Sequence, residues 1–253
     1  MTLEYLPLLK VQRDLYDLPR GIERFREYIQ TMTGGGDELK LPLVAMNPMG
    51  KGHLPPFLDH LLAIDADDVG ARALADASSA LADEPGDYRA CLVVSDDLKG
   101  GWTNRYASEF SYRFEQRAMY RRAWLPAILW TSETYDVALV REEVQQCVYR
   151  AVHVQRHGAA RTLREMLTQE SYAMLGAGST APRLEEDDLA YTREVLREYM
   201  SATNHATLIA ALFGDAAARE LGYQPLGLSP RNLQATLGRF SLEIVTWSRQ
   251  RPL

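Results

Sequence analysis

Short apolar runs alternate with amphipathic stretches in the first half of the chain, and each run stops abruptly at polar residues. The runs cover residues 41–46, 90–94 and 125–130. Continuous apolar runs of this length, bounded by turn residues, are typical of strands buried on both faces. The stretches between them place apolar residues on one side of a helix. This alternation predicts parallel strands connected by helices.

The helical stretches are recognised by apolar positions three and four residues apart. We expect helices over residues 18–31, 56–64, 66–83, 106–122 and 137–157. A further helix should end near residue 175, and others should cover residues 187–200, 216–221 and 230–247.

The run Ala206–Phe213 is apolar throughout and fits either a strand or a core helix. We favour a strand, because the run ends in Gly-Asp much as the earlier runs end in polar residues. The fold class is then α/β, with a largely parallel central sheet of about four strands covered by helices. An α+β fold with high helix content is the alternative. No shift in composition marks a boundary, so we expect one globular domain over residues 1–253.

The composition narrows the classes of protein. The 253 residues are 46% hydrophobic and 25% charged, with a net charge of −6. A nucleic-acid binder normally has a basic excess, so that class is disfavoured. The first ten residues lack a signal peptide's basic start, no run is long enough to span a bilayer, and Cys91 and Cys147 fit buried thiols in a reducing compartment. We expect a soluble cytoplasmic protein that does not insert into membranes.

The densest group of polar residues follows the run 90–94. It contains the candidate catalytic residues Asp96, Asp97 and Lys99 and the candidate ligand-binding residues Asn104 and Arg105. Open α/β sheets bind ligands beyond the carboxyl ends of their strands. Paired carboxylates there can serve as acid and base or hold a divalent cation. We expect Asp97 to be the general base or a metal ligand and Lys99 to stabilise negative charge. The alternative is a polar loop in which an aspartate caps the backbone.

The other two runs are also followed by candidate site residues. Lys51 and His53 follow the first run and are predicted to meet an anion, although they fit an exposed turn as well. Glu133 follows the third run and is a candidate catalytic residue, or part of the cap of the next helix. The glycine spacing of a phosphate-binding loop is missing, as are the Gly-x-Ser-x-Gly and Gly-x-Gly-x-x-Gly motifs.

His153 and His157 are four residues apart, a spacing that puts two imidazoles on one helical face and allows them to share a zinc ion. A glutamate does not follow the first histidine, so the metalloprotease signature is incomplete. We place the pair opposite the helix's apolar stripe, which makes surface or interface histidines the competing interpretation. On the preceding helix, Arg113, Arg117 and Arg121 are predicted to form a basic ridge.

The sequence leaves three hypotheses open. The first is an enzyme that acts on a small anionic metabolite at the strand ends, by Asp/Lys acid–base or metal-assisted chemistry. The second is a non-catalytic binding or assembly protein, suggested by the arginine ridge and the histidine face and compatible with a homo-oligomer. The third is a zinc hydrolase that uses His153 and His157. No cofactor is specified beyond a divalent metal ion, and the sequence alone does not decide whether the protein is an enzyme.

Overall fold

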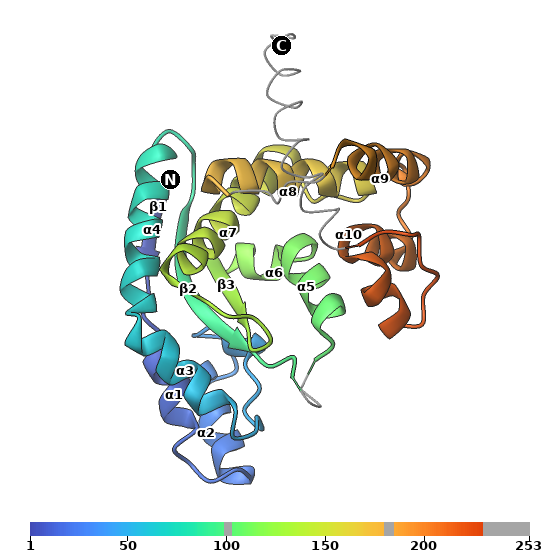
Figure 1. Cartoon of the computed structure of the whole chain (residues 1–253). Coiled ribbons are helices and arrows are strands. Elements are labelled where there is room, and N and C mark those ends of the chain that lie inside the picture. Colours follow the sequence, from blue (N-terminus) through green and yellow to red (C-terminus); the bar gives the residue numbers. More distant parts are fainter. Residues whose placement is uncertain (99–102, 180–184, 230–253) are drawn as a thin grey trace. The chain divides into compact units, whose positions relative to one another are not determined.

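The computed structural model describes residues 1–98, 103–179 and 185–229, and their contacts divide the chain into two compact units (Figure 1). The first, which we call the sheet unit, comprises residues 1–105 and 116–148. The second, the helical unit, comprises residues 106–115 and continues from residue 149. The expected single domain over residues 1–253 stays a prediction.

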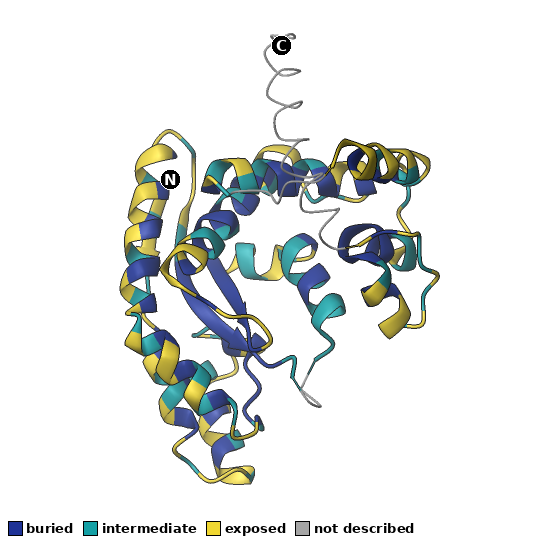
Figure 2. Ribbon diagram, in the orientation of Figure 1, coloured by how far each residue is buried: buried dark blue, intermediate teal, exposed yellow. Residues whose placement is uncertain are grey.

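The sheet unit is built on three strands among the described residues, β1 (Thr2–Tyr5), β2 (Asp87–Ser95) and β3 (Trp124–Trp130). They pair in the order β1-β2-β3, and both pairings are parallel. Every residue of β3 and the last six of β2 are buried, so these strands appear dark blue in Figure 2. The parallel sheet is therefore confirmed, as are its strands around 90–94 and 125–130, whereas four strands are not found.

Helices precede and separate the strands of the sheet unit. They are α1 (Leu9–Leu15), α2 (Ile22–Thr33), α3 (Leu54–Ala63), α4 (Ala66–Ala80), the short α6 (Arg117–Arg121) and the first part of α7 (Val137–His157). Helices α1 and α4 both contact β2, and α6 contacts β3. Because helices cover strands whose side chains are apolar on both faces, the sheet forms the core of this unit.

The predicted first strand is wrong. Residues Leu43–Ala45 form a 3-10 helix, η1, and Leu43 and Met46 are buried as core residues rather than as members of the sheet. Pro42 has no backbone N–H to give to a strand ladder. The free edge of β2 is instead taken by β1, whose alternating sequence Thr-Leu-Glu-Tyr fits a strand with period two.

The edge of β2 beyond β1 is completed by a side chain. Gln12, fully buried on α1, donates from Nε2 to the carbonyl of Leu92 (2.9 Å), and its Oε1 accepts from the N–H of Val94 (2.8 Å). These are the backbone groups that a longer β1 would pair. The amide of Gln12 therefore takes the place of the backbone N–H and C=O of one strand residue.

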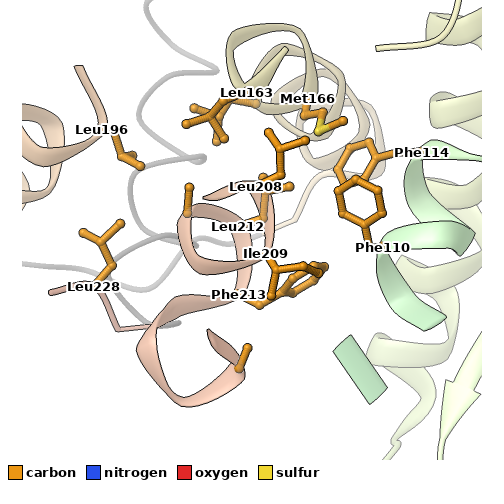
Figure 3. Packing of buried hydrophobic residues seen from close by; sticks show 13 residues of the cluster. Phe110, Phe114, Leu163, Met166, Leu196, Leu208, Ile209, Leu212, Phe213 and Leu228 are labelled. Carbon is orange, nitrogen blue, oxygen red and sulfur yellow. The ribbon is translucent and has the colours of Figure 1, made fainter. Parts of the chain in front are cut away.

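The helical unit contains α5 (Arg105–Phe114) from residue 106 on, the end of α7, α8 (Leu163–Ala177), α9 (Glu186–Tyr199) and α10 (His205–Glu220). Its apolar core joins Phe110 and Phe114 of α5 to Leu163 and Met166 of α8 and to a row of residues on α10 (Figure 3). The described residues of this unit form helices and loops, with no strand.

Two further expectations about secondary structure fail. Ala206–Phe213 is helical and buried almost throughout, because an apolar run fits a core helix as readily as a strand. The helix expected over 106–122 is two helices, with a break at Glu115–Gln116. The predicted arginine ridge therefore does not lie along one continuous helix. The helix expected over 230–247 lies outside the described residues.

In the portion of the chain described here, no helix is both long and apolar enough to cross a membrane.

Candidate functional site

The carboxyl ends of β2 and β3 lie side by side in the sheet unit. Ser95 is paired with Trp130 in the strand register, and the N–H of Thr131 donates to the Ser95 carbonyl at 3.1 Å. The residues that follow the two strands must therefore meet, as parallel pairing requires. Four of the predicted site residues, Asp96, Asp97, Arg105 and Glu133, come together here, and His53 joins them from a loop.

Asp96 is the buried centre of this group, with 2% of its surface exposed. Its Oδ2 accepts from Nδ2 of Asn47 at 2.8 Å, and its Oδ1 lies 2.8 Å from Nε2 of His53. The N–H of Leu98 donates to the same Oδ1 at 3.2 Å, and the Thr131 hydroxyl lies 3.2 Å from it, with a single proton that Asp96 shares with Asp97. A carboxylate with this many donors is held in one orientation.

Hydrogen bonds made by Asn47 hold the loop that carries His53. The carbonyl of Asn47 accepts from the buried hydroxyl of Tyr16 at 2.6 Å, and the Asn47 side chain accepts from the N–H of Met49 at 3.0 Å. Gly50 is required for close packing, because a Cβ there would lie 1.8 Å from Cδ1 of the fully buried Leu54. Burial, followed by the charge of Asp96, raises the pKa of Tyr16, which therefore stays a neutral donor.

His53 immediately precedes α3, and 27% of its side chain is exposed. Its Nε2 faces Asp96 Oδ1, and an ionised carboxylate can only accept a hydrogen bond. The proton of a neutral His53 ring is therefore on Nε2, which leaves Nδ1 as an acceptor. A buried carboxylate that orients a partly exposed imidazole is the arrangement used by histidine general bases.

Asp97 has a different environment, although it is the next residue. Its Oδ1 accepts from the N–H of Ser132 at 2.9 Å and from the Thr131 hydroxyl at 3.0 Å, and its Oδ2 accepts from the Ser132 hydroxyl at 2.5 Å. Nη1 of Arg105 also donates to Oδ2, at 3.1 Å. The carboxylate is thus surrounded by donors that fix the turn after β3.

Arg105 links the ends of both strands. Its guanidinium stacks on the buried ring of Trp130, with Cζ 4.6 Å from the ring centroid, while Nη1 contacts Asp97 and the Ser132 hydroxyl. Nη2 forms an ion pair with Oε1 of Glu133 at 3.3 Å. Stacking and two hydrogen-bonding edges hold the planar group in position.

The remaining predicted residues of this site are placed as follows. Lys51 is exposed on the same loop as His53, and Asn104 directly precedes Arg105. Lys99 lies outside the described residues. The sequence did not single out Asn47 and Thr131, which contact Asp96 directly. Both are the first polar residues after apolar runs, and this position was the available signal.

The predicted zinc ligands lie in the helical unit, where the ring centroids of His153 and His157 are 4.7 Å apart. Only His157 is exposed. His153 is buried against Tyr172 of α8, with ring centroids 5.6 Å apart, so the interpretation of both histidines as surface residues is wrong for His153. Among residues 1–98, 103–179 and 185–229, no three His, Cys, Asp or Glu side chains gather to hold a metal ion. The geometry therefore gives no support to the zinc hypothesis.

His153 should instead make the protein less stable in acid. Burial, followed by the charge of His157, lowers the pKa of His153 to about 4, whereas an unfolded histidine titrates near ~6.5. Below pH ~6.5 the histidine of the unfolded chain becomes protonated while His153 in the folded protein stays neutral. The free energy of unfolding therefore decreases until the pH reaches about 4. The shift corresponds to at most ~3 kcal/mol. Urea unfolding across this pH range should show that the free energy of unfolding depends less on pH in His153→Phe than in the wild type. Equal slopes for the two proteins would contradict this prediction.

Comparisons with known proteins leave the site to be interpreted from its geometry. No protein-family model matches the chain, and no significant match is found among curated proteins or solved structures.

Proposed function

We propose that the protein is an enzyme that acts on a small anionic metabolite at the carboxyl ends of β2 and β3, with His53 as its general acid–base. The observation that carries this proposal is the contact between Nε2 of His53 and the buried carboxylate of Asp96. That contact leaves Nδ1 to take a proton from a substrate. The negative charge of Asp96 would then stabilise the imidazolium that forms.

The contacts change the roles expected for the two aspartates. Asp96 acts through His53, because its oxygens are enclosed by Asn47, Thr131 and the backbone. Asp97 positions Arg105 and Ser132, since donors already occupy both of its oxygens. Proton transfer is therefore assigned to His53, and binding of the substrate's anionic group to Arg105, with exposed Lys51 on the loop of His53 as an auxiliary cation.

Replacing His53 with asparagine should abolish turnover while the protein stays folded. The purified protein is incubated with a pooled metabolite mixture, and mass spectrometry follows the consumption of each compound. We expect a carboxylate-bearing metabolite to be consumed by the wild type and the rate to fall about 10²–10⁴-fold in His53→Asn, the usual contribution of a general base. Asp96→Asn should lower the rate as well.

A second histidine on α3 provides a matched control. His60 is exposed, and its Nε2 bonds to the carbonyl of Tyr135 at 2.8 Å, outside the strand-end group. His60→Asn should consume metabolites at the wild-type rate, and circular dichroism should show the same helix content in all variants. Wild-type turnover by His53→Asn would refute the assignment.

The second candidate is a non-catalytic binding or assembly protein. Helix α2 favours it, because this helix buries Arg24 and leaves Ile22 60% exposed and Ile29 36% exposed. Buried Arg24 donates to the carbonyls of Leu18 and Gly50, so its burial is satisfied. If no metabolite is consumed, an apolar surface of this kind is where binding would be sought.

A further inference from the structure

We infer that Glu133 occupies the position of a substrate carboxylate on Arg105 and leaves it when the substrate binds. This inference deepens the proposed function and rests on it, since it names the chemical group that the strand-end site would recognise. It concerns the outer, Nη2 edge of the guanidinium, where the partner is Glu133.

The two carboxylates on Arg105 differ in how firmly they are held. Asp97 is buried, with 3% of its side chain exposed, and donors from Thr131 and Ser132 fix it. Glu133 has 54% of its side chain exposed. Exposed ion pairs contribute little to stability, so Glu133 can be displaced where Asp97 cannot.

The guanidinium itself stays in place without Glu133. Stacking on Trp130 fixes its plane, and the contacts of Nη1 with Asp97 and Ser132 fix its rotation in that plane. The Nη2 edge is then presented in one direction whether or not Glu133 contacts it. A preformed arginine edge that normally holds a carboxylate is best matched by another carboxylate.

The charges around Arg105 also favour a ligand that replaces Glu133 over one that binds in addition to it. Asp97 and Glu133 already form ion pairs with the single guanidinium of Arg105. A further anion that bound beside Glu133 would be repelled by it. When a carboxylate of the ligand replaces that of Glu133, Arg105 keeps the same number of carboxylate partners, so this repulsion is avoided.

The inference is tested with malonate as the probe, by calorimetric titration of the full chain. Glu133→Gln should bind malonate about 2–5-fold more tightly than the wild type, because a competing pair of the exposed class is removed. Arg105→Gln should lower the affinity at least about tenfold, and Arg105→Lys should fall between these, since it keeps the charge but loses the planar fork.

Glu194→Gln is the matched control, because Glu194 forms an exposed ion pair with Arg197 far along the chain on α9. It should leave malonate affinity unchanged. Unaltered or weaker binding by Glu133→Gln would overturn the inference, as would tightening by Glu194→Gln of equal size. If the same variants respond to inorganic phosphate and not to malonate, the carboxylate assignment is wrong.

The test separates this inference from the function on which it rests. His53→Asn should bind malonate as the wild type does, because the ligand contacts Arg105 and not the imidazole. Loss of turnover in His53→Asn with no response in the Glu133 variant would leave the acid–base proposal standing and remove the carboxylate site. Unchanged turnover in His53→Asn, together with tighter malonate binding by Glu133→Gln, would leave an anion-binding site without a general base.

Discussion

Replacing Glu170 with glutamine should lower the free energy of unfolding by about 3–5 kcal/mol, the usual cost of removing one partner of a buried ion pair. Glu170 lies on α8 in the helical unit and is 1% exposed. Nε of Arg150 donates to both of its oxygens, at 2.9 and 3.1 Å, and Nη1 of Arg113 donates at 2.9 Å. Glutamine keeps the shape and loses the charge, which removes the carboxylate that the buried Arg150 contacts.

The protonation of Glu170 supports this account. Burial by itself would raise the pKa of Glu170, but the charges of Arg150 and Arg113 outweigh it, so the pKa is lowered. The carboxylate is therefore ionised in the folded protein at neutral pH. Its contribution to stability is present above the pKa of an unfolded glutamate and is lost as the pH falls through the lowered value.

Two control variants separate charge from packing. Glu194→Gln removes an exposed ion pair and should change stability by less than ~1 kcal/mol. The double variant Glu170→Met with Arg150→Met replaces the pair with apolar side chains and should recover most of the loss, as buried pairs often allow. Guanidinium unfolding followed by circular dichroism measures all three. A loss below ~1 kcal/mol in Glu170→Gln would show that the ion pair is not closed in solution.

The parts of the fold that could be predicted depend on burial on both faces. The runs containing Cys91 and Ile128 form strands because each is apolar on consecutive positions and short. Parallel pairing of β2 with β3 brings together the residues that follow, Asp96, Asp97 and Glu133, but the sequence could not supply the strand order on which this meeting depends. The site depends on the end of a strand pair, and hydropathy locates such ends well.

The errors arise where hydropathy does not distinguish two environments. Leu43 and Leu212 are as apolar as the strand residues, yet both are in core helices. The helix at Leu212 did have a local signal: Asn204 caps it by accepting from the N–H of Thr207 at 2.9 Å. No comparable signal marks the break between α5 and α6, since neither Glu115 nor Gln116 is a helix breaker.

The orientation of polar side chains also could not be read from the sequence. His153 was expected at the surface or an interface because helical periodicity places it opposite the apolar stripe, but aromatic contacts with Tyr172 bury it. Asp96 and Asp97 were both candidate catalytic residues, with Asp97 as the expected general base or metal ligand, and tertiary contacts give the two aspartates different partners. His53 contacts Asp96 only because the loop from Asn47 folds back onto β2, and residues distant in sequence determine that path.

Gln12 illustrates the same limit and leads to the second large effect. Its side-chain amide completes the edge of β2, so Gln12→Leu should lower the free energy of unfolding by about 2–5 kcal/mol. Leucine matches glutamine in size but offers no donor or acceptor. The carbonyl of Leu92 and the N–H of Val94 would then be buried without partners, and each such group costs ~1–3 kcal/mol.

The chemistry of the two contacts allows a sharper test with glutamate at position 12. Gln12→Glu keeps an acceptor for Val94 but cannot donate to Leu92, and it buries a charge, so it should be at least as destabilised as Gln12→Leu. Gln30→Leu on α2 changes an exposed glutamine and should alter stability by less than ~0.5 kcal/mol. Hydrogen exchange adds a local measurement, because the amide of Val94 is protected by Gln12 alone at this edge. Its protection should fall in Gln12→Leu, whereas unchanged protection in that variant would mean that another group closes the sheet there.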